Sequence, residues 1–111
     1  MGDIPVKRNV TLKARWEVRN RETKELVDVT SGYTVKCVIK PISTSATTLL
    51  ELTAGSGITL GNGWVEVILS DVQTQGLALG YNSRAWYLVT VKDNGTGEVD
   101  EVDSGKLIFS G

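Results

Sequence analysis

Apolar and polar residues alternate along the first segment of the chain. Between positions 6 and 18, apolar side chains take the even positions and polar side chains the odd ones, and only Arg8 breaks this pattern. A period of two predicts a strand with one buried face and one exposed face. At about 13 residues the segment is longer than a typical strand, so we expect it to bend or to run along both sheets of a sandwich.

Shorter alternating runs follow and are separated by Gly, Asn, Asp or Pro. They predict strands over residues 26–29, 33–40, 48–53, 58–60, 64–69, 84–92, 99–102 and 106–109. Asn62-Gly63 predicts a type I′ hairpin turn, and Asp93-Asn94-Gly95 predicts a second hairpin. Ser70 and Gln73 have the spacing of a capping box, with Gly76 as the C-cap, so we expect a single helical turn there.

These elements predict an all-β protein. The strands and turns favour a sandwich or a partly closed barrel, and of the two we expect a single antiparallel β-sandwich, immunoglobulin-like or jelly-roll-like. It should have seven to nine short strands and at most one or two helical turns. With 111 residues, the chain should form one domain over residues 1–111. The alternation places the following residues in its core: Val10, Leu12, Trp16, Val35, Cys37, Ile39, Val89 and Val91.

The composition excludes several kinds of chemistry. The sequence has no histidine and one cysteine, Cys37, which excludes Ser-His-Asp and Cys-His catalysis, histidine zinc sites and an intrachain disulfide. Two sites built from carboxylates stay open, a calcium loop and a glycosidase pair. The EF-hand spacing is not met, because Gly95 falls where the second ligand should be, and a solvated hairpin is the favoured interpretation. We therefore expect no catalytic, cofactor-binding or metal-binding residues.

Charge is divided unevenly along the chain. Residues 1–40 have nine Lys or Arg and five Asp or Glu, whereas residues 41–111 have three and eight. We name two candidate protein-interface sets, which could meet complementary charges on a partner or on another copy of the chain. The basic stripe, which the alternation places on the exposed face of the first strand, is Lys7, Lys13, Arg15 and Arg19. The acidic hairpin is Glu98, Asp100, Glu101 and Asp103.

Other interpretations of these features remain. The basic stripe could be an ordinary solvated strand face, and a nucleic-acid surface is disfavoured because Glu17 interrupts the stripe and the net charge is −1. Trp16, Trp64 and Trp86 could stack against sugars or bases, but packing in the core is favoured for the set. Trp16 lies on the apolar side of its strand, while the sequence leaves the faces of the other two open.

Membrane and secretion signals are missing from the sequence. No apolar run approaches the length of a membrane span, and residues 1–8 contain no apolar core of a secretory signal. We expect a soluble protein that is made in a reducing cytoplasm.

The order of strands and turns resembles a family of small virion proteins of tailed bacteriophages. Four stretches carry the likeness: "VTLKARWEVRN", "LVDVTSGYTVKCVIKP", "GITLGNGWVEVILSDVQTQGLALG" and "RAWYLVTVKDNGTGEVDEVDSGKLIF". The family includes immunoglobulin-like N-terminal domains of baseplate proteins and stand-alone β-sandwich proteins of heads and tails. The likeness covers nearly the whole chain as a pattern of strands and turns, without a chemical motif.

This resemblance implies a non-enzymatic structural protein of the virion. Because the chain stops after one sandwich, it favours a capsid decoration or cement protein that binds and stabilises the major capsid lattice. A tail or baseplate accessory protein is the alternative, and a carbohydrate- or nucleic-acid-binding module is a further one. The implied partners are the major capsid protein or tail proteins, with copies of itself as an option and no membrane. The protein would be made in the host cytoplasm and located in the virion.

Overall fold

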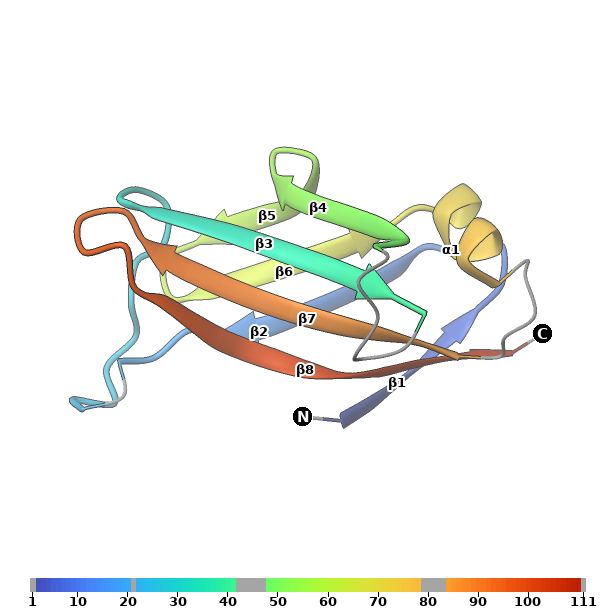
Figure 1. The fold of residues 1–111 in the computed structure, drawn as a ribbon, viewed down its shortest axis with the longest axis horizontal. Helices are drawn as coiled ribbons and strands as arrows, with labels where there is room; N and C mark the ends of the chain where they lie inside the picture. Colours follow the sequence, from blue (N-terminus) through green and yellow to red (C-terminus); the bar gives the residue numbers. More distant parts are fainter. Residues whose placement is uncertain (1, 21, 42–47, 79–83, 111) are drawn as a thin grey trace.

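Eight strands and one short helix make up the fold, as the computed structural model shows for residues 2–20, 22–41, 48–78 and 84–110 (Figure 1). The all-β prediction and the predicted number of strands are confirmed. In chain order the elements are β1 (Gly2–Lys7), β2 (Leu12–Glu17), β3 (Tyr33–Lys40), β4 (Leu50–Ala54), β5 (Gly57–Gly61), β6 (Trp64–Leu69), α1 (Asp71–Ala78), β7 (Arg84–Asp93) and β8 (Val99–Ser110).

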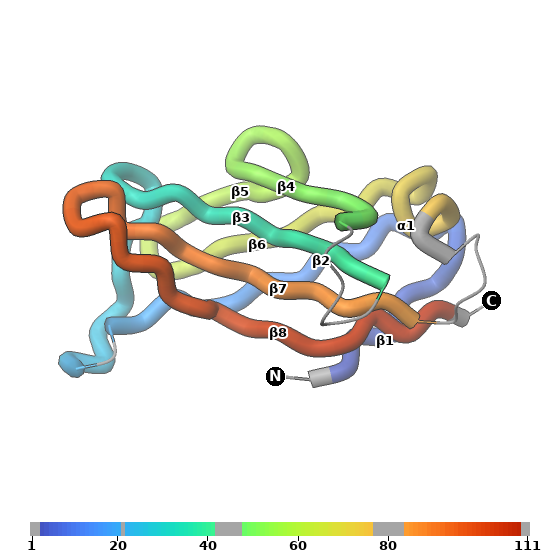
Figure 2. The backbone as a smooth tube through the Cα atoms, in the orientation of Figure 1, coloured from blue at the N-terminus to red at the C-terminus, as the bar shows by residue number. Residues whose placement is uncertain are grey.

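All eight strands belong to one sheet, with the order β1-β8-β7-β3-β4-β5-β6-β2. The sheet curls until it is nearly a barrel, and its two edge strands, β1 and β2, are consecutive in the sequence (Figure 2). The predicted sandwich of two sheets is not confirmed. The sheet is also mixed, because β1 pairs with β8 in parallel and β4 pairs with β5 in parallel.

The long first strand of the prediction is two strands. Residues 8–11 form a turn in which Asn9 has a φ of 65° and the Val10 amide donates to the Lys7 carbonyl (3.3 Å). Arg8, the residue that breaks the alternation, marks the point where β1 ends. The turn takes the chain from one edge of the sheet to the other, so β1 pairs with β8 whereas β2 pairs with β6.

A tight loop joins β4 to β5 and lets both strands run in the same direction. Gly55 and Gly57 both have positive φ, which a residue with a side chain adopts at a cost. A Cβ on Gly57 would also lie 2.5 Å from the Leu52 Cδ2 atom. Only Thr53 and Ala54 of β4 pair with β5, so the sheet is held by few hydrogen bonds at this corner.

The core lies inside the curled sheet. Seventeen apolar residues of the described chain are buried there, and Leu12 and Trp16 of β2 pack half-buried against them. Seven of the eight predicted core residues therefore contact the core. Val10 does not: it is 49% exposed, because it lies in the turn that replaces the middle of the predicted strand. The buried residues are Val6, Val18, Val29, Val35, Cys37, Ile39, Leu52, Ile58, Val65, Val67, Leu69, Ala85, Tyr87, Val89, Val91, Leu107 and Phe109.

Helix α1 covers one end of the barrel. Its capping box is confirmed: the Ser70 amide donates to Gln73 Oε1 (2.9 Å), and the Gln73 amide donates to Ser70 Oγ (3.1 Å). Thr74 is fully buried and its hydroxyl hydrogen-bonds the Val10 carbonyl (3.1 Å), which joins the helix to the turn between β1 and β2. The helix has eight residues, so Gly76 lies inside it and is not the predicted C-cap.

Two further local predictions are wrong. Residues 26–29 form isolated bridges rather than a strand, because Leu26 pairs with Arg19 and Asp28 pairs with Asn62. The turn between β5 and β6 is not type I′, since Gly63 has a φ of 90° and Asn62 is not among the residues with positive φ.

Candidate interaction site

The turn between β7 and β8 has its own hydrogen-bond network. The Asp93 amide donates to the Glu98 carbonyl (2.8 Å), and the Gly97 amide donates to the Asp93 carbonyl (2.7 Å). The Asp93 carboxylate accepts the Gly95 amide (2.8 Å), and the Thr34 hydroxyl of β3 lies 2.9 Å from the Asn94 side-chain oxygen. These bonds fix the direction in which Glu98 and the start of β8 leave the turn.

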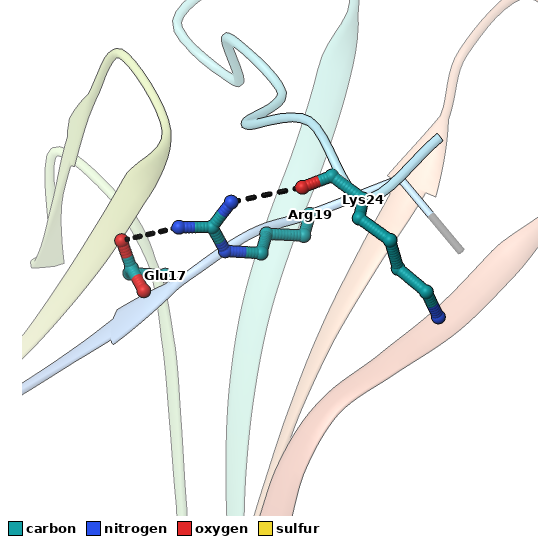
Figure 3. Close-up of polar contacts among 3 residues, drawn as sticks. All are labelled: Glu17, Arg19 and Lys24. Atoms are coloured by element: carbon teal, nitrogen blue, oxygen red, sulfur yellow. Dashed lines mark hydrogen bonds and ion pairs between the residues drawn. The ribbon is translucent and has the colours of Figure 1, made fainter. Parts of the chain in front are cut away.

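A second polar hairpin lies at the same end of the barrel, directly after β2. The Asn20 side-chain oxygen accepts the amides of Glu22 (2.8 Å) and Thr23 (3.0 Å), as expected for a residue that stabilises a turn. Arg19 donates to the Lys24 carbonyl (2.8 Å) and forms an ion pair with Glu17 (3.2 Å), as Figure 3 shows. Arg19 therefore supports this hairpin with its guanidinium group.

A cleft of about 480 Å³ separates the two hairpins. Its walls come from the end of β2 with residues 18–20 and Glu22 on one side, and from the turn and first half of β8 on the other. Its apolar lining residues are Val18, Val27, Tyr33, Val91 and Val102. Among the described residues that line the cleft, Arg19 is the only basic one. The acidic ones are Glu17, Glu22, Asp93, Glu98, Asp100 and Glu101.

The structure divides the predicted basic stripe. Lys13 and Arg15 lie exposed on the outer face of β2, whereas Lys7 ends β1 at the opposite edge of the sheet and Arg19 lies at the cleft. The four residues do not share the face of one strand, because the turn at residues 8–11 interrupts that strand.

Arg15 already has partners in this chain. Its guanidinium lies 3.9 Å from the centre of the Trp64 ring and 3.5 Å from the Glu66 carboxylate. The ring of Trp64 in turn covers Gly61, where a Cβ would lie 2.1 Å from the ring. Trp64 therefore stabilises the outer face of β5 and β6, a role that aromatic residues often have beside a strand glycine.

The predicted acidic hairpin is also divided. Glu98, Asp100 and Glu101 line the cleft, but the Asp103 carboxylate lies between strands. It accepts hydrogen bonds from the Trp16 indole of β2 (2.7 Å) and from the Tyr87 hydroxyl of β7 (2.8 Å). The register of β7 and β8 shifts next to Asp103, where Val89 pairs with Asp103 and the following residue of β7 pairs with Glu101. This bulge at Val102 changes which side chains of β8 face inward.

Asp103, Trp16 and Tyr87 form a hydrogen-bonded triad, and its surroundings shift the pKa values of Asp103 and Tyr87. Burial of the carboxylate acts to raise the pKa of Asp103, but the hydrogen bonds that it accepts, including those from Tyr87 and Trp16, outweigh burial and leave the pKa below its usual value. Burial and the hydrogen bond to Asp103 raise the pKa of Tyr87. Asp103 is thus an ionised acceptor that links β8 to β2 and β7.

The three tryptophans do not form one platform. Trp16 faces the core and lies 5.7 Å from the Tyr87 ring, so its predicted orientation is confirmed. Trp64 and Trp86 alternate with buried residues and lie on the outer face, on strands that are not neighbours in the sheet. The ammonium group of Lys106 lies over Trp86, 5.1 Å from the ring centre.

No model of a protein family matches this sequence, and a search of curated proteins also finds no match. In the part of the chain that the structure describes, no three His, Cys, Asp or Glu residues are arranged to hold a metal ion. The one described helix, α1, is too short to span a membrane.

Proposed function

We propose that the protein is a non-enzymatic structural component of a tailed-bacteriophage virion, most specifically a capsid decoration protein that stabilises the major capsid lattice. The observation that supports this proposal is the order of strands and turns along the sequence, which resembles that of this family. The four matching stretches contain β2, β3, β5–β6–α1 and β7 with most of β8, and these strands belong to a single sheet. A tail or baseplate accessory protein is the alternative with the same support.

The proposal includes the fold: we interpret the curled sheet as an immunoglobulin-like or jelly-roll-like sandwich. The corner between β4 and β5, where two residue pairs hold the sheet, divides the eight described strands into a set of five and a set of three. We interpret β1-β8-β7-β3-β4 and β5-β6-β2 as the two layers of a sandwich that remain joined at that corner. Strands that pass from one layer to the other through a bend are common in such folds.

Analysis of the particle tests the proposal directly. Virions should be purified from cells that carry the gene in its natural genome, and their proteins quantified by mass spectrometry. A decoration protein should be present in many copies per particle and should survive repeated gradient purification. If purified particles lack the protein, the proposed function is wrong; if it is present at tail copy number, the decoration role is replaced by the tail alternative.

A pair of charge reversals tests whether the basic stripe contributes to docking. Lys7 and Lys13 are exposed, so Lys7→Glu with Lys13→Glu should leave the fold intact and lower the occupancy of particles, more so at low salt. The matched control is Arg84→Glu with Lys92→Glu, which makes the same charge change at exposed positions of β7. Equal occupancy for both variants would show that the stripe is an ordinary solvated surface.

A further inference from the structure

β1 is held in the sheet by pairing with a single neighbour. It is an edge strand that pairs in parallel with residues 105–110 of β8, and no other strand of the described chain pairs with it. Its inner face still belongs to the core, because Val6 is 1% exposed and Ile4 packs against the buried residues. If β1 left this position, the edge of β8 would expose the core and would need a strand with the same pattern of side chains.

The turn at residues 8–11 determines which copy of β8 receives this strand. It holds Asn9 at a φ of 65°, a left-handed conformation that a residue with a side chain adopts at a cost, and it leaves Val10 49% exposed. Two hydrogen bonds keep the turn closed: the Val10 amide donates to the Lys7 carbonyl (3.3 Å), and the Thr74 hydroxyl donates to the Val10 carbonyl (3.1 Å). The closed turn is therefore balanced between these bonds and its own cost.

The sequence of the turn also suits an extended strand. Apolar residues occupy even positions on both sides of it, at Val6, Val10 and Leu12. With the turn extended, these side chains would share one face, as they do in a continuous strand. Lys7 would then lie about 16 Å from Leu12, so β1 would continue the line of β2 and leave its own β8. The chain thus has a closed form and an open form that differ only in this turn.

We propose that the edge of β8 at residues 105–110 binds β1 of a second copy of this chain, in a dimer whose copies exchange this strand. The exchanged strand has the same register and side chains, so Val6 and Ile4 refill the same core. Exchange of an identical element is for this reason a low-cost route to dimers. This inference does not rest on the virion role, because it follows from the sheet order, the turn and the alternation.

Substitutions of Asn9 shift the balance between the two forms. Asn9→Val places a β-branched residue at a positive φ, which should disfavour the closed turn about tenfold in each copy and lower the dissociation constant of the dimer about a hundredfold. Asn9→Gly should favour the monomer, because glycine adopts a positive φ readily. Lys24→Val is the matched control: Lys24 also has a φ of 65° but lies in the hairpin after β2, so the dissociation constant should not change. Analytical ultracentrifugation over a series of concentrations measures it.

A cross-link identifies the copy that supplies β1. Asp3 of β1 and Lys106 of β8 are paired in register and both are accessible, whereas Cys37 is buried. In Asp3→Cys with Lys106→Cys, a short bismaleimide should join the two new thiols within one chain of the monomer. The same pair added to Asn9→Val, isolated as a dimer by size exclusion, should be joined between chains and should run as a dimer on a denaturing gel.

Refolding of the unmodified protein tests the exchange without a change in the turn. Chains unfolded in urea and refolded at high concentration should form dimers, because β1 of a second copy then competes with the chain's own β1 for the edge of β8. Refolding at high dilution should give monomers. This measurement also decides the question if Asn9→Val does not fold, which circular dichroism would reveal.

Three results would overturn the proposal. If neither Asn9→Val nor refolding at high concentration gives a dimer, the turn stays closed and the strand is not exchanged. A dimer in which the cross-link stays within one chain would show association through another surface. Equal dimerisation of Lys24→Val would show that a general loss of stability, rather than opening of the turn at residues 8–11, causes association.

Discussion

Removal of the Asp103 carboxylate should destabilise the fold more than removal of an exposed carboxylate does. In Asp103→Ala, the Trp16 indole and the Tyr87 hydroxyl both lose this acceptor, which they reach at 2.7 and 2.8 Å. A hydrogen bond to a charged group contributes about 1.5–3 kcal/mol. Because Asp103 is half-buried and water replaces part of the loss, we expect the free energy of unfolding to fall by about 2–4 kcal/mol.

Single donors can be removed to separate the two bonds. Trp16→Phe and Tyr87→Phe each keep an aromatic ring in place, and each should cost about 1–2 kcal/mol in urea-induced unfolding followed by circular dichroism. Glu51→Ala, at an exposed carboxylate of β4, is the control and should change stability by less than about 0.5 kcal/mol. In the double variant Asp103→Ala with Tyr87→Phe, the loss should be smaller than the sum of the single losses. Additivity within about 0.5 kcal/mol would refute the proposed coupling.

The pH dependence gives an independent check of the same triad. The pKa of Asp103 is lower in the folded protein than its usual value, so its ionised form stabilises the fold. That stabilisation is present above the ordinary carboxyl pKa, about 4, and is lost as the pH falls through the lowered value. Asp103→Asn should therefore lose less stability than the unmodified protein between about pH 5 and pH 2. Identical acid profiles would contradict this role.

Three further predictions concern single residues. Burial raises the pKa of the Cys37 thiol to about 12, so a thiol reagent at neutral pH should label the native protein far more slowly than the urea-unfolded protein. Gly76→Ala should raise the free energy of unfolding by about 0.5–1 kcal/mol, because Gly76 lies inside α1 with open space around its Cα atom. Gly61→Ala should lower it by about 1–3 kcal/mol, since the new methyl group would displace the Trp64 ring. Urea unfolding measures both, and a stabilised Gly61→Ala would contradict the contact.

Local alternation predicts the strands of this protein well. The period of two correctly places Val35, Cys37 and Ile39 on the inner face of β3, because a strand with one buried face needs apolar residues at every second position. It fails at Val10, which is apolar but lies in a turn. Arg8 was the visible signal of that turn, a polar residue at a position where the pattern requires an apolar one.

Pairing between strands could not be predicted in the same way. Which edge β1 joins depends on contacts with β8, about a hundred residues away in the sequence, and periodicity carries no information about distant partners. The inward position of Asp103 depends on the bulge at Val102. Its signal in the sequence is a change in the phase of the alternation, because the inward apolar residue Val102 is at an even position whereas Leu107 and Phe109 are at odd positions.

The parallel pairing of β1 with β8 also constrains how the chain folds as it is synthesised. β1 leaves the ribosome before every other strand of this sheet, and its partner, residues 105–110, is made about a hundred residues later. Until then β1 has no place in the sheet, and β7 has no neighbour on the side that β8 will occupy. Pairing of such distant segments is slow, and the open edge of β7 is available for association with other chains. A ribosome-bound chain that lacks β8 should therefore be protease-sensitive over residues 2–7, and a longer chain in which β8 has left the ribosome should be protected there.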